Sequence, residues 1–368
     1  MSFSTCTLYY LSGTGNTLTA VRKISENLNA KGIRASQIAI DRSEESSEPA
    51  PGKDALIGFC YPTHGFSLPW IMLKFILRFP SAKDQSVMLM NSRAGAKYLK
   101  WYGPGVSGIA LILPLLILRF KGFRIRYLLS IDPPSNWISV HPGYGKRWID
   151  GLWKHADVFI DKLSGRIIEG KRYIRPNFFW MMPFDLALVP ISIMYSLFGR
   201  FFMAKTFIAG ADCNACRICE QKCPARAIRI RNNKPYWSFR CESCMRCLNI
   251  CPSKSIQASH SLVMIMITVF MILPVSVWIG SLISNHPGIQ SLSYLKHIDF
   301  VISWSISLLI TYFIYWGVFY LMQMKWVARV MEYTSLTKYW RRYVAPGIRV
   351  KDFGQTDQQV NKDSGISA

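Results

Sequence analysis

Eight of the ten cysteines lie between Cys213 and Cys251, in two runs of the same form, Cys-x2-Cys-x2-Cys-x3-Cys-Pro. Within each run, three cysteines spaced by two residues can bind three irons of one [4Fe–4S] cubane. The fourth cysteine points away and ligates the neighbouring cluster where two clusters share a domain. The spacing therefore predicts two clusters, with these ligands: Cys213, Cys216, Cys219 and Cys251 for cluster one, and Cys241, Cys244, Cys247 and Cys223 for cluster two.

Two other uses of clustered cysteines fit this pattern less well. Structural zinc sites usually take four ligands in two separated pairs, and neither run divides in that way. Disulfide frameworks are typical of small secreted domains, and the sequence predicts no secretory signal. Thiolates that hold clusters also need a reducing compartment, so we expect this part of the chain to be cytoplasmic.

The net charge and the apolar content indicate which kinds of molecule the chain could bind. The chain has 368 residues, enough for two or three domains. Its formal net charge is +23, and 50% of its residues are hydrophobic. A basic surface of this size suits nucleic acid, anionic lipid headgroups or an acidic protein. Because many Lys and Arg flank long uncharged apolar stretches, we expect a membrane surface and no nucleic acid.

The N-terminal residues predict a strand (Thr5–Leu11), a turn of small and hydroxyl residues, and a helix to about Ala30. Glycines in such a turn let the backbone approach a phosphate, while hydroxyls and free helix N–H groups bind the anion. The third glycine of a dinucleotide fingerprint is missing. The turn instead resembles the FMN-phosphate loop of flavodoxins, which gives these candidates for cofactor binding: Ser12, Gly13, Thr14, Gly15, Asn16 and Thr17.

The following segments alternate between predicted strands and helices, as in an α/β fold. Strand candidates are residues 35–40, 55–60, 86–90 and 124–131; helix candidates are residues 68–79, 106–120 and 143–162. Together with the first strand they predict a doubly wound parallel sheet in the flavodoxin-like order 2-1-3-4-5. A sheet of this order binds FMN beyond the strand ends, where the order reverses.

The loops after the third and fourth strands should then hold the flavin ring. The candidates in these loops are Tyr61, Pro62, Thr63, His64, Gly65, Phe66, Asn91, Ser92, Arg93 and Gly95. Tyr61 and Phe66 could stack on the ring. His64 is either an ordinary loop histidine or a proton-transfer group. Arg93 is either a surface cation or a charge that shifts the flavin potential.

The stretch from Met1 to about Ala258 resembles bacterial and archaeal fusions of a flavodoxin domain to a two-cluster ferredoxin. The matching residues are the Tyr10–Thr17 turn, the Tyr61–Pro62 loop, Pro133–Trp137 after the fifth strand, and both cysteine runs. The resemblance implies electron transfer. Two features depart from the soluble fusions. Flavodoxins are usually acidic whereas this chain is basic, and it also carries apolar segments of membrane-spanning length.

Three apolar segments predict contact with a membrane. Phe178–Phe198 is about long enough to cross. Crossing would separate the flavodoxin from the clusters, so we expect a kinked helix lying in the interface; a core helix between domains is the alternative. Leu262–Ser284 and Phe300–Met324 are longer and uncharged, and basic residues flank them, which predicts a hairpin with both ends in the cytoplasm. The tail at Trp340–Tyr343 predicts a further membrane-surface segment.

The predicted order is a flavodoxin-like FMN-binding domain (1–165), a basic linker with a membrane-interfacial apolar helix (166–205), a small α+β 2[4Fe–4S] ferredoxin domain (206–258), a transmembrane helical hairpin (259–326) and a basic cytoplasmic tail (327–368). We expect a protein bound to the cytoplasmic membrane that relays electrons between FMN, two [4Fe–4S] clusters, and a redox partner protein or lipid-soluble acceptor. The alternatives are an enzyme that reduces a quinone or an unsaturated isoprenoid lipid at its flavin, and a redox sensor or assembly protein. No catalytic acid or nucleophile stands out, which favours the carrier.

Overall fold

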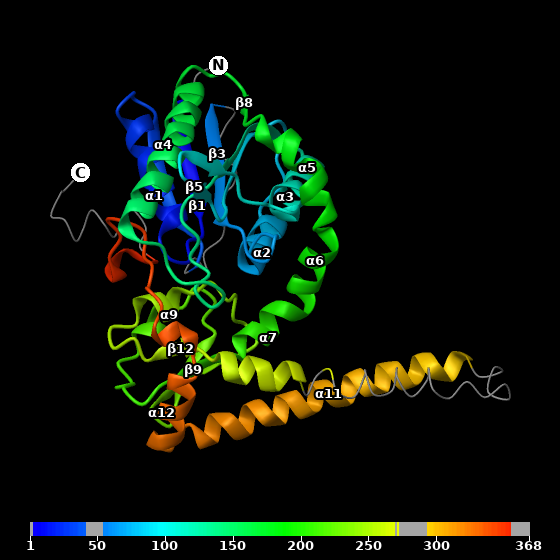
Figure 1. Cartoon of the computed structure of the whole chain (residues 1–368). Coiled ribbons are helices and arrows are strands. Elements are labelled where there is room, and N and C mark those ends of the chain that lie inside the picture. Colours follow the sequence, from blue (N-terminus) through cyan, green and yellow to red (C-terminus); the bar gives the residue numbers. More distant parts are fainter. Residues whose placement is uncertain (1–2, 42–53, 269–270, 272–292, 355–368) are drawn as a thin grey trace.

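The protein is described by a computed structural model covering residues 3–41, 54–268, 271 and 293–354 (Figure 1). Its larger part is a parallel sheet in the order β2-β1-β3-β4-β7-β8. The strands are β1 (Thr5–Tyr10), β2 (Arg34–Ala39), β3 (Ala55–Pro62), β4 (Ser86–Ser92), β7 (Arg124–Ile131) and β8 (Tyr173–Ile174). The first five follow the order 2-1-3-4-5, so the predicted doubly wound topology is confirmed.

Helices cover both faces of this sheet. One face carries α1 (Asn16–Asn29) and α4 (Lys146–Ile168), and the other carries α2 (Trp70–Arg78) and α3 (Ile109–Phe120). Strand β3 is buried along its whole length between the two layers. Its nearly continuous apolar run is typical of a strand covered on both faces. A short antiparallel ribbon of β5 (Ala96–Tyr98) and β6 (Trp101–Gly103) follows β4.

Residues 165–177 do not form the linker that their basic composition predicts. Helix α4 continues to Ile168, and β8 adds a sixth strand beside β7. Arg175, directly after β8, is buried, and its guanidinium donates to Asp132 at 2.9 Å. The basic composition predicted a solvent-exposed linker, but Arg175 is buried and its charge is paired with Asp132.

The apolar segment after β8 forms a bent series of helices, called here the arc (177–204). It consists of α5 (Asn177–Ala187), α6 (Val189–Met194), a π-helical turn (Tyr195–Gly199) and α7 (Arg200–Ala204), and it bends by 66° after α5. Pro190 lies in the first turn of α6. Proline fits the first turn of a helix, whereas within a continuous helix it removes a backbone hydrogen bond and kinks the axis, as Pro183 inside α5 can also do. A new helix therefore begins at this point. The arc curves along one side of the sheet domain and reaches the second domain (Figure 1).

The arc turns polar side chains towards the sheet domain. Asp185 is buried and accepts hydrogen bonds from the backbone N–H groups of Ser107 and Gly108, both at 2.8 Å. These groups lie at the N-terminus of α3, so a carboxylate from the arc caps that helix. Ser192 donates to the carbonyl of Phe66 at 2.8 Å. Large apolar side chains of the arc are exposed instead: Phe179, Trp180, Phe184, Leu186, Ile191, Ile193, Met194, Leu197 and Phe198.

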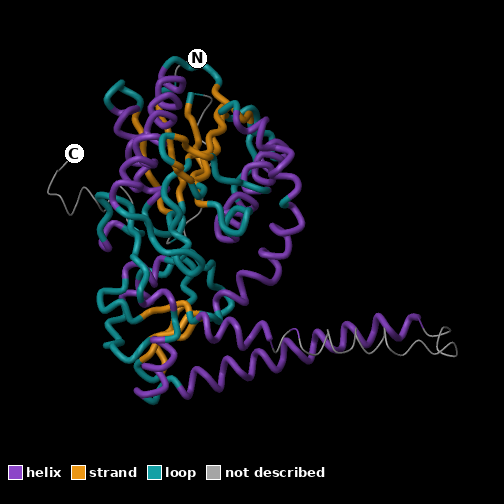
Figure 2. Tube along the Cα trace, in the orientation of Figure 1, coloured by secondary structure: helices purple, strands orange, loops and turns teal. Residues whose placement is uncertain are grey.

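The cysteine-rich segment forms a small second domain. Its elements are the antiparallel pairs β9 (Phe207–Ala209) with β12 (Ile256–Ala258) and β10 (Ile228–Arg231) with β11 (Lys234–Trp237), and the helices α8 (Ile218–Gln221) and α9 (Arg246–Ile250). Figure 2 shows these strands as a group separate from the large sheet. The arrangement is the small α+β fold that the sequence predicts.

The chain leaves the second domain near Leu262 and packs against it again through α11 (Ser293–Leu321) and α12 (Lys325–Tyr333). Helix α11 extends away from the body of the molecule (Figure 1). Most of the first predicted span lies outside the described residues, and the second lies mainly on α11. In the described part of the chain, no single helix is both long and apolar enough to cross a membrane. The arc and the pair of α11 with α12 meet the length and composition criteria only as bent pairs, at 66° and 118°.

We expect Asp185→Ala to destabilise the sheet domain, because two backbone N–H groups at the start of α3 lose their acceptor. Loss of a helix cap costs about 0.5–2 kcal/mol. Thermal unfolding in detergent, followed by circular dichroism, should show a lower midpoint. Asp157→Ala is the control, since it removes only a partly exposed carboxylate paired with Lys23. Equal midpoints for the two variants would contradict the capping role.

Candidate functional site

A cavity lies at the carboxyl ends of β1, β3, β4 and β7, where the sheet domain meets the second domain. It opens to solvent. Doubly wound sheets bind ligands at this edge. The cavity is lined by Ser12, Gly13, Thr14, Asn16, Thr17, Pro62, Thr63, His64, Gly65, Phe66, Ser92, Arg93, Ala94, Val106, Pro134, Ser135, Asn136, Trp137, Tyr195 and Ser243.

Four residues predicted to bind the cofactor do not line the cavity: Gly15, Tyr61, Asn91 and Gly95. Tyr61 is fully buried in the core, and its hydroxyl donates to the Ala110 carbonyl at 2.8 Å, so the predicted stacking on a ring is wrong. Asn91 is also fully buried, and its amide donates to the hydroxyl of Thr63 at 2.8 Å. These two side chains support the site loops from inside the domain, because the last residues of a buried strand still point into the helical layers that cover the sheet.

The turn before α1 has an unpaired hydroxyl at its centre. Gly15 has a φ of 103°, a value that favours glycine, and ends the turn at the start of α1. Ser12 Oγ accepts a hydrogen bond from the Leu18 N–H at 3.2 Å. Thr14 Oγ1, in contrast, is buried and lacks a hydrogen-bond partner in the described part of the chain. Buried polar atoms are rarely left unsatisfied, so the turn fits an anion such as a phosphate, which the N-terminus of α1 also favours.

The segment after α12, called here the strap (340–354), packs against this turn and not along a membrane surface as predicted. Tyr343 is only 2% exposed, and its hydroxyl donates to Asn16 Oδ1 at 2.6 Å. The Asn16 amide donates to the Pro134 carbonyl at 2.8 Å. The Ala345 N–H donates to the Thr14 carbonyl at 2.9 Å. The Asn16 side chain, predicted to bind the cofactor, is therefore held by protein groups at both ends.

The loop after β3 presents a buried histidine to the cavity. Gly65 and Phe66 both have left-handed conformations, with φ of 52° and 62°, and His64 pairs with Ser67 through two backbone hydrogen bonds. Burial lowers the pKa of His64 to about 4, so its ring is neutral at pH 7. Neither ring nitrogen has a hydrogen-bond partner among the described residues. A neutral imidazole with free nitrogens can donate or accept a hydrogen bond to a ligand.

Arg93 is not a surface cation. It is buried, and its Nε donates to Asp132 at 2.6 Å, while Asp132 also accepts from Arg175 at 2.9 Å. Burial lowers the pKa of Arg175, and the neighbouring Asp132 carboxylate acts in the opposite direction. The two guanidinium groups thus share the Asp132 carboxylate beside the cavity, and the charge of Arg93 also acts on the carboxyl group of Asp185.

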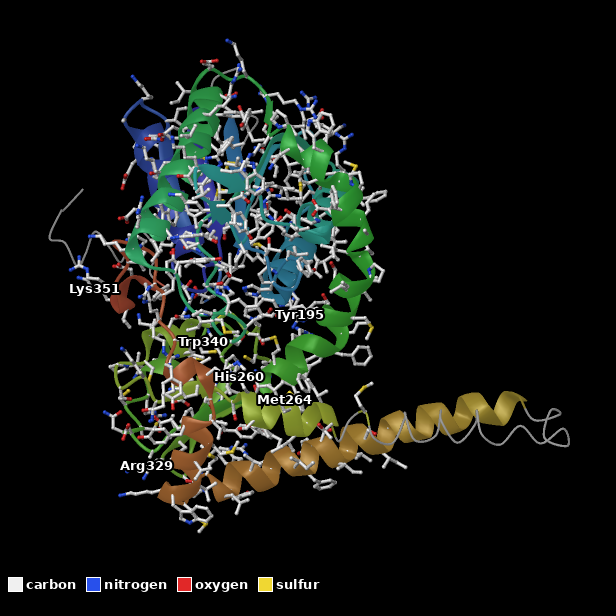
Figure 3. The ribbon with its side chains drawn as sticks, in the orientation of Figure 1. Tyr195, His260, Met264, Arg329, Trp340 and Lys351 are labelled. Carbon is white, nitrogen blue, oxygen red and sulfur yellow. The ribbon has the colours of Figure 1, made fainter. Side chains whose placement is uncertain are left out.

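Besides Ala94 and Val106, three parts of the wall were not predicted as site residues. Pro134–Trp137 follows β7, so its place at the carboxyl edge could have been found from the strand order. Tyr195 comes from the arc, and its ring packs so closely on Gly65 that a Cβ there would lie 2.0 Å from it. Figure 3 shows Tyr195 where the arc reaches the junction of the two domains. Ser243 comes from the second cysteine run. Nothing local in the sequence marks these last two.

The turn before α1 touches the second cysteine run. A Cβ on Gly13 would lie 2.6 Å from the carbonyl oxygen of Cys244. Arg246 is 3% exposed; its Nε donates to the Gly13 carbonyl at 3.0 Å, and it forms an ion pair with Asp41 at 2.9 Å. It also donates to the Lys222 carbonyl at 2.7 Å. One buried guanidinium thus joins the turn, the end of β2 and both cysteine runs.

The structure brings the eight cysteines together in two sets. Cys213, Cys216, Cys219 and Cys251 line one cavity. Burial and the charges of Cys213 and Cys251 together raise the pKa of Cys219 to about 12. For Cys247, burial raises the pKa most, and the charges of Cys241, Cys244, Cys223 and, from the first set, Cys219 add to this. Each set contains three cysteines of one run and the fourth of the other. In the described part of the chain, no three His, Cys, Asp or Glu side chains are placed to hold a single metal ion.

Residues 212–256 match the family model described as a 4Fe-4S dicluster domain. No curated protein matches the chain. Among solved structures, a flavodoxin from the domain Archaea is 16% identical, with 45% of this chain and 97% of that chain covered and a TM-score of 0.31. Flavodoxin 1 from Bacillus cereus is 18% identical, with coverage of 44% and 99% and a TM-score of 0.29. Rubredoxin oxygen:oxidoreductase from Desulfovibrio gigas is 12% identical, with coverage of 45% and 37% and a TM-score of 0.28.

The chain thus combines a flavodoxin-like α/β domain, shown by its strand order, with a 4Fe–4S domain. The cavity at the sheet edge and the cysteine sets lie on either side of one domain junction.

We expect Thr14→Val to weaken flavin binding, because it removes the unpaired hydroxyl at the centre of the turn. Loss of one hydrogen bond to a charged group costs about 1.5–3 kcal/mol, or roughly a ten- to hundredfold weaker affinity. Titration of flavin-depleted protein with FMN, followed by flavin fluorescence, measures the effect. Thr19→Val makes the same change on α1 outside the cavity and should bind normally. Equal affinity of the two variants would mean that the turn does not hold the phosphate.

Proposed function

We propose that the protein is a membrane-bound electron-transfer flavo-iron–sulfur protein that relays electrons between FMN and two [4Fe–4S] clusters to a membrane or lipid-soluble acceptor. The observation that carries the proposal is the shared wall between the two cofactor sites. Ser243 of the second cysteine run lines the flavin cavity, and Gly13 of the phosphate turn lies against Cys244. Two cofactors bound here would be neighbours without any rearrangement of the chain.

The residues at the cavity fit FMN. Thr14 and the N-terminus of α1 would hold the phosphate, while the loops at Thr63–Phe66 and Ser92–Ala94, together with Trp137, would hold the ring. FMN, when bound, supplies an acceptor of two electrons that can be released one at a time. Neutral His64 would meet the polar groups of the flavin without adding charge.

The two cysteine sets fit one cubane each. Cluster one would be held by Cys213, Cys216, Cys219 and Cys251, and cluster two by Cys241, Cys244, Cys247 and Cys223. Cluster two would then lie beside the flavin cavity. Cys216 is exposed, so cluster one would lie nearer the surface and could exchange electrons with an external protein. The chain would thus order the cofactors from a two-electron site at the domain junction to a one-electron site nearer the surface.

Membrane attachment is supported by the packing of the residues before the predicted hairpin against those after it. Leu262 and Met266 at the exit to the predicted hairpin pack with Met322 and Ala328 at its return. The strap then hydrogen-bonds to the phosphate turn of the first domain. Both chain ends would therefore lie on the side of the cofactors, as a hairpin requires. The exposed apolar side of the arc, with its polar side turned inward, suits a helix lying in the membrane interface.

A second candidate is an enzyme that reduces a quinone or an unsaturated isoprenoid lipid at its flavin. Tyr195 favours it, because this residue belongs to the apolar arc and also lines the flavin cavity. If the arc lies in the interface, a lipid-soluble molecule would approach the flavin at this point. Rapid oxidation of the flavin by a short-chain quinone after loss of both clusters would favour the enzyme over the carrier.

For the cofactors, we expect anaerobically purified protein to contain about eight irons and one flavin per chain. Cys219→Ser should perturb the electron paramagnetic resonance signal of cluster one, and Cys223→Ser that of cluster two, although both cysteines belong to the first run. Cys6→Ala, in β1, is the control and should leave both signals intact. Loss of the same signal in both serine variants would contradict the crossed ligand sets, and zinc in place of iron would contradict the clusters.

For the topology, we expect the sheet domain, clusters and strap to share one side of the membrane. A glycosylation or protease-site tag within residues 290–293 should be reached from outside. Tags near Ser2 and Ser364 should be reached only after the membrane is opened. An external tag at Ser2 with an internal tag at Ser364 would show that the arc spans the bilayer, and a single cytoplasmic relay would then be impossible.

A further inference from the structure

Lys205 is a buried cation at the point where the arc enters the second domain. It follows α7 directly and is 4% exposed. Its Nζ donates to the Trp237 carbonyl at 2.6 Å and to the Tyr236 hydroxyl at 3.3 Å. Both acceptors are neutral, so these bonds satisfy the donors of the ammonium group without cancelling its charge.

Three aromatic rings enclose the ammonium group. Its Nζ lies 4.2 Å from the ring centroid of Tyr315 and 4.5 Å from those of Tyr236 and Phe239. At such distances the ring faces attract a cation. The rings also keep water away, so the charge is screened less than a surface lysine would be. Tyr315 belongs to α11, which means that the predicted membrane helix forms one wall of this cage.

The cage adjoins cluster two. Trp237 and Phe239 belong to the segment that leads into Cys241, and the Trp237 side chain packs in the same core as Cys241. Burial lowers the pKa of Lys205 to about 8, while the negative charge of Cys241 acts in the opposite direction. The lysine therefore stays mainly protonated at pH 7 and senses the charge of the cluster-two ligands.

We propose that Lys205 is a positioning residue for electron flow, which raises the reduction potential of cluster two by holding an unscreened positive charge beside it. The inference rests on the proposed function, because it requires a cluster on Cys241, Cys244, Cys247 and Cys223. Reduction adds one electron to this cluster and makes or breaks no bond. A fixed nearby cation favours the more negative state, and net charge around the sulfurs is one of the factors that set such potentials.

The test is a redox titration of the full-length protein in detergent, with the two cluster signals followed by electron paramagnetic resonance. Lys205→Gln can keep a hydrogen bond to the Trp237 carbonyl but removes the charge, and Lys205→Met removes both. Both variants should lower the midpoint potential of cluster two and leave that of cluster one unchanged. Lys205→Arg keeps the charge and should restore the wild-type potential.

Arg231→Met is the matched control. Arg231 is exposed and stacks on the outer side of the cage, 4.5 Å from the Tyr236 ring. Removing its charge should leave both potentials unchanged, because solvent and salt screen it. An equal shift in Arg231→Met and Lys205→Gln would overturn the proposal, since burial of the charge would then have no special effect.

Two further results would also overturn it. One is an unchanged potential in Lys205→Gln with both clusters present. The other is loss of cluster two in both neutral variants while Lys205→Arg is normal, which would assign Lys205 a structural role. A wild-type protein that lacks the second cluster signal altogether would instead contradict the proposed function, so the two failures are distinguishable.

Discussion

A single buried guanidinium fixes the relation between the two domains. Arg246 lies between two cysteines of the second run, pairs with Asp41 at 2.9 Å and donates to the backbone of the phosphate turn. Breaking a buried ion pair by removing one partner typically costs about 3–5 kcal/mol, because the other charge is left uncompensated. The domains therefore cannot slide or rotate at this junction without losing several bonds at once. The shared wall of the cavity and the cysteine sets depends on that rigidity.

The arc gives the same junction a second support from outside. Its polar residues cap α3 and bond to the loop after β3, while its large apolar residues remain exposed. An almost entirely apolar segment can therefore lie on the surface of the sheet domain, because its few polar side chains point inward and form hydrogen bonds there. Asp185, which looks out of place in an apolar helix, is the residue that binds this helix to the sheet domain.

Much of both domains follows from sequence because the signals are local. The apolar strands, the glycine at the end of the turn before α1 and the cysteine spacing within each run each reflect a constraint between residues that are close in the chain. Tyr61, Arg175 and Tyr343 were misread because their neighbours in space are distant in the chain. A tyrosine at a strand end can face a cavity or a core, and a basic residue can face solvent or Asp132. Only tertiary packing decides between these, so Tyr195 and Ser243 could not be found in advance.

The strap has a consequence for how the protein is made. Residues of the strap bond to Thr14 and Asn16 and, through Arg342, to the carbonyls of Leu248 and Ile256. Ribosomes deliver these residues after the segment predicted to enter the bilayer, whereas domains generally fold in order of their synthesis. The turn before α1 therefore gains these contacts only after the strap has been synthesised. A product truncated before the strap would lack them.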